Sequence, residues 1–336
     1  MPDRISTSSQ RRARTAAAEV PTKYGPVLQA LQIRKPDGED LTVWLSHPLA
    51  LLHRTVEECP PFKTVLRKQL EKHPCNPARP WGLVIYVDEV TPTDPLSSHE
   101  DTKKIQAFYW SFLEFDDYLH DERFWFIVSC ATSVHVTELD TGMSALIRHV
   151  LKECFFNASS NHLERSGMAI DMREASATEP SIVRLFARHR LTIADFKGLK
   201  EVLLSMGQQG VRPCPACANI VKDDRADNAT KLALTSVEPH RWKPHTDASI
   251  RKYQRYMRDL IDAGLSKTGR QDLETRLGFH YRPESIINDA ELQYGSMSTL
   301  MFDWPHIYFI GGLFGKELSA FSRTRGRLLR ETGDRF

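Results

Sequence analysis

The stretch that decides the fold is Gly82-Leu-Val-Ile-Tyr-Val87, an unbroken apolar run that ends in Asp88 and Glu89. A continuous apolar run of this length is typical of a strand that is buried on both faces of a sheet. Because successive side chains of a strand point to opposite faces, Asp88 and Glu89 should lie on opposite sides. We therefore expect a central strand that presents one carboxylate to a given face at its end.

Further strands and helices are expected after this run. Ile105 to Phe115 is aromatic-rich and prone to form a strand, and residues 123–131 read as a third strand. The connections are too short for helical crossovers, so these three strands should pair antiparallel. Helical periodicity marks residues 141–155, a strand-like run covers 181–194, and a helix is expected over 196–206. These elements predict an α/β fold with a mixed sheet.

Composition places few limits on function. The net charge is +2 and the hydrophobic share is 41%, so bulk charge does not mark a nucleic-acid-binding protein. No run of eighteen apolar residues occurs, which argues against a membrane span, and the first twenty residues have no apolar region typical of secretion. Arginines cluster near both ends of the chain, as Arg11, Arg12 and Arg14 and as Arg323, Arg325, Arg327 and Arg330.

Asp195 is the second candidate carboxylate, since it follows the strand-like run 181–194 and precedes a helix. An aspartate at such a junction is also a standard helix N-cap, so capping and chemistry both stay open. Together with Asp88 it could converge on divalent cations at the ends of adjacent strands. Mg²⁺ prefers oxygen ligands, and two such ions can drive phosphodiester cleavage. We predict Asp88 and Asp195 as catalytic ligands of Mg²⁺ or Mn²⁺.

A cysteine pair, Cys214-Pro-Ala-Cys217, is the third signal. Thiolates at this spacing can turn toward one metal, but a structural zinc site needs four ligands. A bound Zn²⁺, two reduced cysteines in a loop and a redox pair all stay open. His240, His245 and His306 are candidate nitrogen ligands, although none has a diagnostic offset.

Two more features carry charge or chemistry. Asp303-Trp-Pro-His306 either begins a helix, with Asp303 as its N-cap, or supplies an aspartate and a histidine that support an active site. The expected helix over 248–263 is apolar on one side. Its other side is either an ordinary solvated face or a surface that contacts nucleic-acid phosphates, formed by Arg251, Lys252, Arg255 and Arg258.

In this order, the features resemble the DDE/D transposases of the hAT, Mutator and CACTA-like kind, including the fungal Plavaka-like relatives. The resemblance covers roughly residues 80–315 and is carried by IYVDE, TIADFKGLK, RPCPACANI and FDWPH. It implies an RNase H-like core with a first Asp on the first strand and a second Asp after the fourth. It also implies a CxxC-containing insertion, a [C/D]xxH motif and a last Glu on a late helix.

The resemblance also implies that this chain stops before the last catalytic glutamate, because only thirty residues follow His306. Glu317, Glu331 and Asp334 are the acidic candidates there. The expected organisation is a disordered basic tail (1–22), an N-terminal helical or mixed segment (23–78), the RNase H-like core (79–208), a mainly helical CxxC-containing insertion (209–300), and the DxxH segment with a basic tail (301–336).

Three hypotheses follow. The leading one is a nuclear, transposase-derived protein that binds DNA and cleaves or transfers phosphodiester strands with Mg²⁺ or Mn²⁺, or a fragment that has lost this activity. The second is a non-catalytic DNA-binding, chromatin or protein-interaction module that retains the fold. The third is an α/β interaction protein with none of these roles. Homo-oligomerisation is left open, and no P-loop, dinucleotide-binding, GxSxG or HExxH motif points to another enzyme class.

Overall fold

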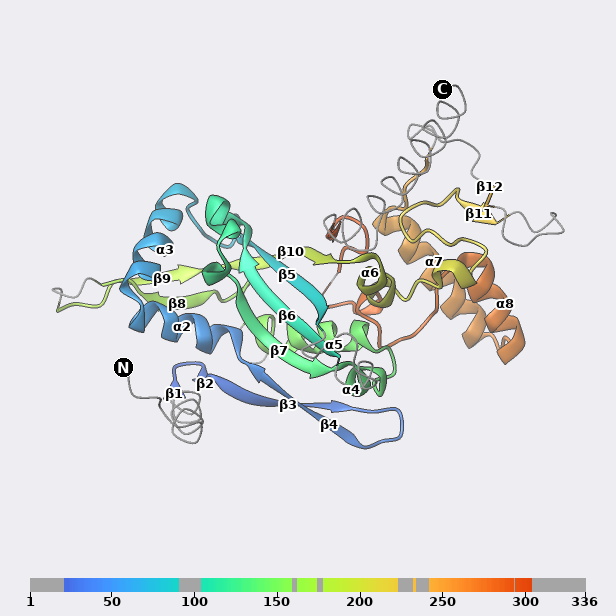
Figure 1. Ribbon diagram of the computed structural model, residues 1–336, viewed down its shortest axis with the longest axis horizontal. Coiled ribbons are helices and arrows are strands. Elements are labelled where there is room, and N and C mark those ends of the chain that lie inside the picture. The colour runs from blue at the N-terminus through green and yellow to red at the C-terminus, as the bar shows by residue number, and fades with distance from the viewer. Residues whose placement is uncertain are drawn as a thin grey trace, which may run out of the picture.

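The computed structural model describes residues 21–90, 104–158, 162–173, 178–222, 232–233, 242–292 and 294–303. Within these residues the chain is α/β, with one seven-stranded mixed sheet flanked by helices and three small two-stranded sheets. The order of strands in the large sheet is β13-β10-β5-β6-β7-β4-β3. Figure 1 shows β5, β6 and β7 side by side at the centre of the molecule.

The central strand is β5 (Trp81–Val90), which contains the apolar run. It pairs antiparallel with β6 (Ile105–Phe112), and β6 pairs antiparallel with β7 (Phe126–Thr132), which confirms the pairing expected from the short connections. On its other side, β5 pairs parallel with β10 (Ala187–Ala194). The strand β13 (Leu300–Phe302) pairs parallel with β10 and forms the edge of the sheet.

The N-terminal segment belongs to the same sheet. The strands β3 (Leu28–Arg34) and β4 (Asp40–Ser46) form an antiparallel hairpin, and β4 joins β7 where Leu45 lies opposite Ser129. Val43 and Leu45 alternate with exposed residues along β4, as expected for a strand with one buried face. The helices α2 (Pro48–Glu58) and α3 (Pro60–Lys72) follow the hairpin and contribute Leu49, Leu52, Val56, Phe62 and Leu66 to the common core.

One face of the sheet carries this core. Alternate residues of β5 and β6 point toward it, and their side chains are almost fully buried because apolar area removed from water is the main stabilising term. The helix α5 (Met143–Val150) and the π-helical turn Leu151–Phe155 pack there, with the ring of Phe155 at 5.4 Å from Trp110. The strand residues on this face are Trp81, Leu83, Ile85, Val87, Phe108, Trp110 and Phe112.

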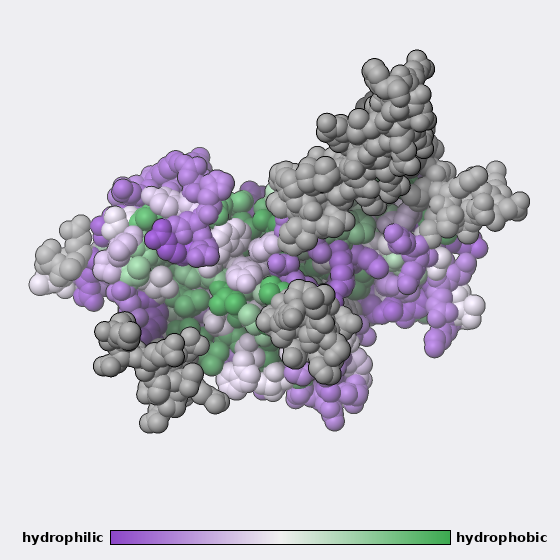
Figure 2. All heavy atoms as spheres, viewed as in Figure 1, coloured by the Kyte–Doolittle hydropathy of each residue, from purple (hydrophilic) through white to green (hydrophobic). Residues whose placement is uncertain are grey.

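The opposite face is aromatic near its middle. Tyr86 lies directly across from Tyr109, and the two rings stack with centroids 6.1 Å apart. The ring of Trp125 meets Tyr86 edge-on at 6.2 Å. Figure 2 shows hydrophobic residues gathered at the centre of the molecule, over β5 to β7. Asp88 shares this face with Tyr86, two residues further along the strand.

The remaining elements lead from β10 to the edge strand. The helix α6 (Phe196–Leu203) follows β10 directly, and α7 (Asp247–Asp262) and α8 (Lys267–Leu277) precede the short 3₁₀-helix Ile286–Asn288 and then β13. The smaller elements are β1 (Pro21–Thr22), β2 (Gly25–Pro26), α4 (Ser133–Thr137), β8 (Met168–Asp171), β9 (Ile182–Leu185), β11 (Val221–Lys222), β12 (Leu232–Ala233) and three 3₁₀-helices (Leu113–His120, Glu122–Phe124, Gly207–Gln209).

A buried carboxylate on α8, that of Glu274, forms hydrogen bonds with the segment that follows the helix. Glu274 accepts hydrogen bonds from Arg270, Arg282 and His280 at 3.0, 3.0 and 2.8 Å, and from the backbone N–H of Tyr281 at 3.1 Å. Burial acts to raise the pKa of Glu274, but these hydrogen bonds outweigh it and lower the pKa to about 2.

None of the helices in these ranges has an apolar stretch long enough to cross a bilayer.

Candidate active site and nucleic-acid interface

The ends of β5 and β10 bring two aspartates together. The strands run parallel, with Ile85 beside Thr192 and Tyr86 beside Ile193. Continuing that register by two residues places Asp88 beside Asp195. Since both lie two residues beyond a matched pair, their side chains leave the same face of the sheet. The register therefore agrees with the adjacency expected from the two strand-end patterns, and the metal-binding role stays a prediction.

A third aspartate lies at the same edge. Ala194 of β10 is paired with Phe302 of β13, so Asp303 comes directly after β13 at the level of Asp195. Asp88 lies near the end of β5, and Asp195 and Asp303 directly follow β10 and β13, so the three aspartates belong to three adjacent parallel strands. We call them the carboxylate row. The sequence analysis treated Asp303 as a helix cap or a supporting residue. The residues after Asp303 lie outside the described ranges, and so does His306.

Tyr86 connects the members of the row. Its hydroxyl donates a hydrogen bond of 2.8 Å to Oδ2 of Asp303. Burial raises the pKa of Tyr86, and the hydrogen bond to Asp303 raises it further. The negative charges of Asp88, Asp303 and Asp195 act in the same direction. All three carboxylates therefore lie close enough to act on one phenol.

Sequence reasoning missed Tyr86. The signal that could have found it is alternation, because a residue two positions before Asp88 in a strand must share its face.

Asp195 also has the structural role that the sequence left open. Its Oδ1 accepts a hydrogen bond of 2.6 Å from the backbone N–H of Gly198, and it is the N-cap of α6. A Cβ atom at position 198 would lie 3.1 Å from this oxygen, so a glycine there gives the carboxylate room to close on the helix. A carboxylate has two oxygens and about four lone-pair sites, so capping through Oδ1 does not use up Asp195 as a ligand.

Glu89 lies on the other side of the sheet, as alternation predicted. Its Oε2 accepts hydrogen bonds from Gln106 at 2.8 Å and Ser133 at 3.2 Å. Lys197 lies 3.1 Å and Lys104 3.7 Å from its Oε1. Two lysines therefore balance Glu89, and it does not belong to the carboxylate row.

Oxygen-rich groups of this kind fit Mg²⁺ better than a softer metal. In the part of the chain that the structure describes, no three His, Cys, Asp or Glu side chains are arranged so that they could hold a metal ion. Mg²⁺ does not require such a cage, because it is commonly bound by one or two carboxylates together with waters and substrate phosphates. Asp88 and Asp195 satisfy that smaller requirement in residue type and placement.

The cysteine pair is brought together. Burial raises the pKa of Cys217 to about 11, and the charge and hydrogen bond of Cys214 act in the same direction. The pair sits in a short antiparallel contact in which Cys217 lies opposite Pro244. No third metal-binding side chain from the described ranges joins it. Zinc binding by Cys214 and Cys217 remains a prediction.

Of the three candidate histidine ligands, only His245 falls within the described ranges. Its backbone N–H donates to the carbonyl of Ala216, between the two cysteines, at 2.8 Å. Its imidazole, however, packs edge-on against Tyr253 and Phe279, with ring centroids 5.6 Å away in each case. Its Nε2 is buried and has no hydrogen-bond partner among the residues that the structure describes, and burial lowers its pKa to about 4. His240 and His306 lie outside these ranges.

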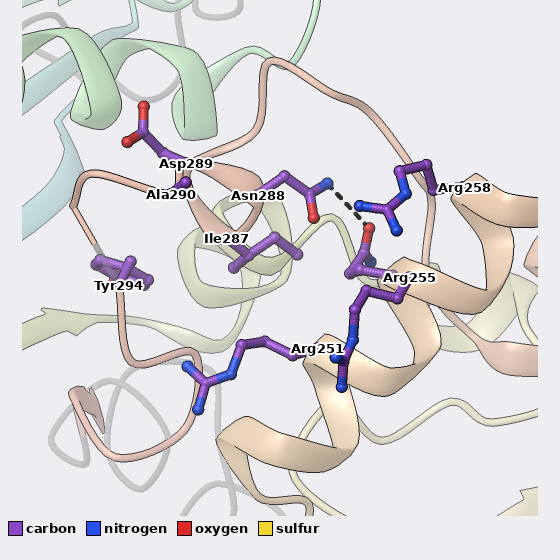
Figure 3. A pocket seen from close by; sticks show the side chains of 9 residues that line it. Arg251, Arg255, Arg258, Ile287, Asn288, Asp289, Ala290 and Tyr294 are labelled. Atoms are coloured by element: carbon purple, nitrogen blue, oxygen red, sulfur yellow. Dashed lines mark hydrogen bonds between the residues drawn. The ribbon is translucent and has the colours of Figure 1, made fainter. Parts of the chain in front are cut away.

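The expected basic face is present on α7. Arg251, Lys252, Arg255 and Arg258 are all exposed. Three of them, Arg251, Arg255 and Arg258, line a cleft of about 470 Å³, which Figure 3 shows, and Lys252 does not.

Comparison with known proteins identifies no family for this chain. No protein-family model matches the chain, and no curated protein sequence matches it.

Proposed function

We propose that this protein is transposase-derived, acts on DNA, and holds a divalent metal ion at Asp88 and Asp195 for phosphodiester cleavage or strand transfer. The observation that carries the proposal is the shared level of these two aspartates on adjacent parallel strands, with Asp303 next in the row. Carboxylate oxygens at the ends of adjacent strands are ligands of the kind that Mg²⁺ prefers.

The order of elements supports an RNase H-like core. In residues 79–208 the large sheet receives four strands, β5, β6, β7 and β10 in chain order, while β8 and β9 form a separate sheet. Asp88 lies on the first of the four strands, and Asp195 directly follows the fourth. This is the placement that the resemblance to DDE/D transposases implies for the first two catalytic aspartates.

Each residue has a definite part in this proposal. When bound, Mg²⁺ or Mn²⁺ would polarise the phosphate and lower the pKa of an attacking water or hydroxyl. Asp88 and Asp195 would hold it, and the cap on α6 fixes the orientation of the Asp195 carboxylate. Tyr86 holds Asp303 through its hydrogen bond. Cys214 and Cys217 would have a structural role if they hold Zn²⁺.

Nicking of supercoiled plasmid DNA in Mg²⁺ or Mn²⁺ tests the proposal. Asp88→Asn removes the charge but keeps the shape, and we expect the nicking rate to fall by about 100-fold or more. The matched control is Asp272→Asn, a carboxylate on α8 that pairs with Arg276 at 2.9 Å, far along the chain from the row. Equal nicking by wild type and Asp88→Asn would remove Asp88 as a metal ligand.

A non-catalytic DNA-binding module is the second candidate function. It is favoured by the N-cap role of Asp195, which accounts for that residue without a metal, and by the lack of a three-ligand group in the described ranges. This candidate predicts no nicking, together with DNA affinity that falls with rising salt and survives both Asp88→Asn and Asp195→Asn.

A further inference from the structure

A concave site separate from the carboxylate row lies beside α7. Arg251, Arg255 and Arg258 are spaced by four and three residues, so they share one face of the helix. The opposite wall consists of residues 287–290 and Tyr294. Figure 3 shows Arg251 reaching into the space between these walls. We call this site the arginine cleft.

The cleft has an excess of positive charge. Its one acidic lining residue is Asp289, whose carboxylate is 2.7 Å from Arg148 and 3.2 Å from Lys152. Figure 3 shows this carboxylate turned away from the cleft arginines. Arg258 pairs with its neighbour Asp259 at 2.8 Å. Arg251 lies close enough to Asp247, one turn earlier on α7, for its charge to act on that carboxylate, and no ion pair of Arg255 is seen in the described ranges.

The floor of the cleft is held by hydrogen bonds. Gln254 is 2% exposed and accepts a hydrogen bond of 3.1 Å from Nδ2 of Asn288. The amide nitrogen of Gln254 donates to the carbonyl of His280 at 3.2 Å, and Nδ2 of Asn288 also donates to the carbonyl of Arg282 at 2.8 Å. These bonds fix the distance between α7 and the opposite wall, so the cleft is present before any ligand arrives.

The cleft is also connected to the carboxylate row. The hydroxyl of Tyr294 donates to Oγ1 of Thr192 on β10 at 2.9 Å, and Thr192 lies beside Ile85, on the face of the sheet opposite the row. Asp247, the first residue of α7, accepts hydrogen bonds from the backbone N–H groups of Met297 and Ser298 at 2.6 and 3.0 Å. The chain then forms β13 and reaches the row. These contacts hold the wall of the cleft to β10 and to the segment that leads into β13.

We propose that the arginine cleft binds the phosphodiester backbone of a nucleic-acid strand. This rests on the proposed function and assigns its phosphate-binding subsite. Guanidinium groups present paired donors that match phosphate oxygens. From Arg251 to Arg258 the helix rises about 10.5 Å, comparable to three nucleotides at about 3.4 Å each along one strand.

The test is fluorescence anisotropy of a labelled single-stranded DNA 20-mer over a range of salt, with EDTA present so that divalent cations play no part. Arg251→Ala and Arg255→Ala should each lower the affinity about tenfold at low salt. Each should also reduce the slope of log K against log salt by about 1. Lys252→Ala is the matched control, since it removes one charge from the same helix outside the cleft, and it should change affinity less than twofold.

Arg255→Lys gives a second readout that does not depend on the loss of a side chain. It keeps the charge but loses the planar fork, so the affinity should fall between those of wild type and Arg255→Ala. Circular dichroism of each variant confirms that the fold is retained.

Other results would overturn the inference. An equal loss in Lys252→Ala and Arg255→Ala would indicate a diffuse basic surface, and no loss in the arginine variants would remove the cleft as a site. Poly-glutamate that competes as well as DNA of equal charge would assign the cleft to an acidic protein segment. Because binding is measured in EDTA and nicking in Mg²⁺, a negative binding result for the arginine variants would not affect the test of Asp88.

Discussion

The phenol of Tyr86 contacts one carboxylate, Asp303, and feels the charges of two others, Asp88 and Asp195. Its hydroxyl is the donor to Asp303, which is only 9% exposed, so removing it would leave a buried acceptor with one partner fewer. A lost hydrogen bond to a charged group costs more than its net contribution to folding suggests, because the acceptor stays desolvated. The residue therefore contributes to stability at the place where we locate the chemistry.

Tyr86→Phe should lower the free energy of unfolding by about 1 to 2 kcal/mol, as measured by urea denaturation. Tyr109→Phe is the matched control. The Tyr109 ring stacks on Tyr86, but its hydroxyl donates no hydrogen bond within the described ranges. Equal destabilisation by the two substitutions would mean that the Tyr86–Asp303 hydrogen bond contributes little.

Glu274 gives a prediction of pH dependence. Its pKa in the folded protein is about 2, below the usual value of a glutamate near 4.5. A depressed pKa means that its contribution to stability is fully present above about pH 4.5 and is lost as the pH falls toward 2. Urea denaturation of wild type and Glu274→Gln between pH 6 and 3 should show a shallower loss of stability in the variant. The same slope in both proteins would contradict this.

At the scale of elements, the helix α6 combines a structural role with the proposed chemistry, since its N-cap is a member of the carboxylate row. Asparagine caps a helix about as well as aspartate but carries no charge. Asp195→Asn should therefore keep the stability of wild type within about 0.5 kcal/mol, whereas Asp195→Ala should lose about 1 kcal/mol. Both variants should lose metal-dependent nicking. Nicking that persists in Asp195→Asn would leave Asp195 as a cap alone.

The cysteine-containing segment gives a metal-content prediction. If Cys214 and Cys217 are zinc ligands, protein purified without chelators should contain about one zinc ion per chain, and Cys214→Ser should contain almost none. Cys130→Ser is the control, because Cys130 is an exposed cysteine on β7. Metal analysis that finds no zinc in the wild type would assign the pair to a loop of reduced thiols.

The elements that sequence predicted well are those with strong local patterns. The apolar run at Gly82–Val87 predicted β5, and the helical periodicity of residues 141–155 predicted α5 and the π-helical turn after it. The short connections predicted the antiparallel pairing of β5, β6 and β7. For the same reason the positions of Asp88 and Asp195 could be anticipated, since both follow such patterns.

What sequence did not provide is long-range pairing. The strand β13 is only three residues long and is defined by its partner β10 rather than by its own composition. Without it, Asp303 could not be placed in the row. The hairpin of β3 and β4 was missed although Val43 and Leu45 alternate, because nothing local indicates that β4 joins β7. The arginine cleft likewise depends on a wall that begins at Ile287, 33 residues after Gln254 on the helix side.

At the scale of the whole molecule, two charged sites of opposite sign are joined by one segment. Figure 1 shows α7 and α8 beyond the carboxyl end of β10, next to α6. Residues 287–303 form the far wall of the arginine cleft at one end and finish with Asp303 at the other. In our proposals the arginine cleft would hold a nucleic-acid backbone and the carboxylate row would hold a metal ion, and phosphodiester chemistry uses both parts.

The most direct test of the central claim is a crystal structure of the protein with a DNA strand and Mn²⁺, with the ion located by its anomalous scattering. We predict an Mn²⁺ ion with a carboxylate oxygen of Asp88 and one of Asp195 each at about 2.1 to 2.2 Å. Anomalous density found only elsewhere, or no density at this edge of the sheet with DNA bound and millimolar Mn²⁺ present, would contradict it.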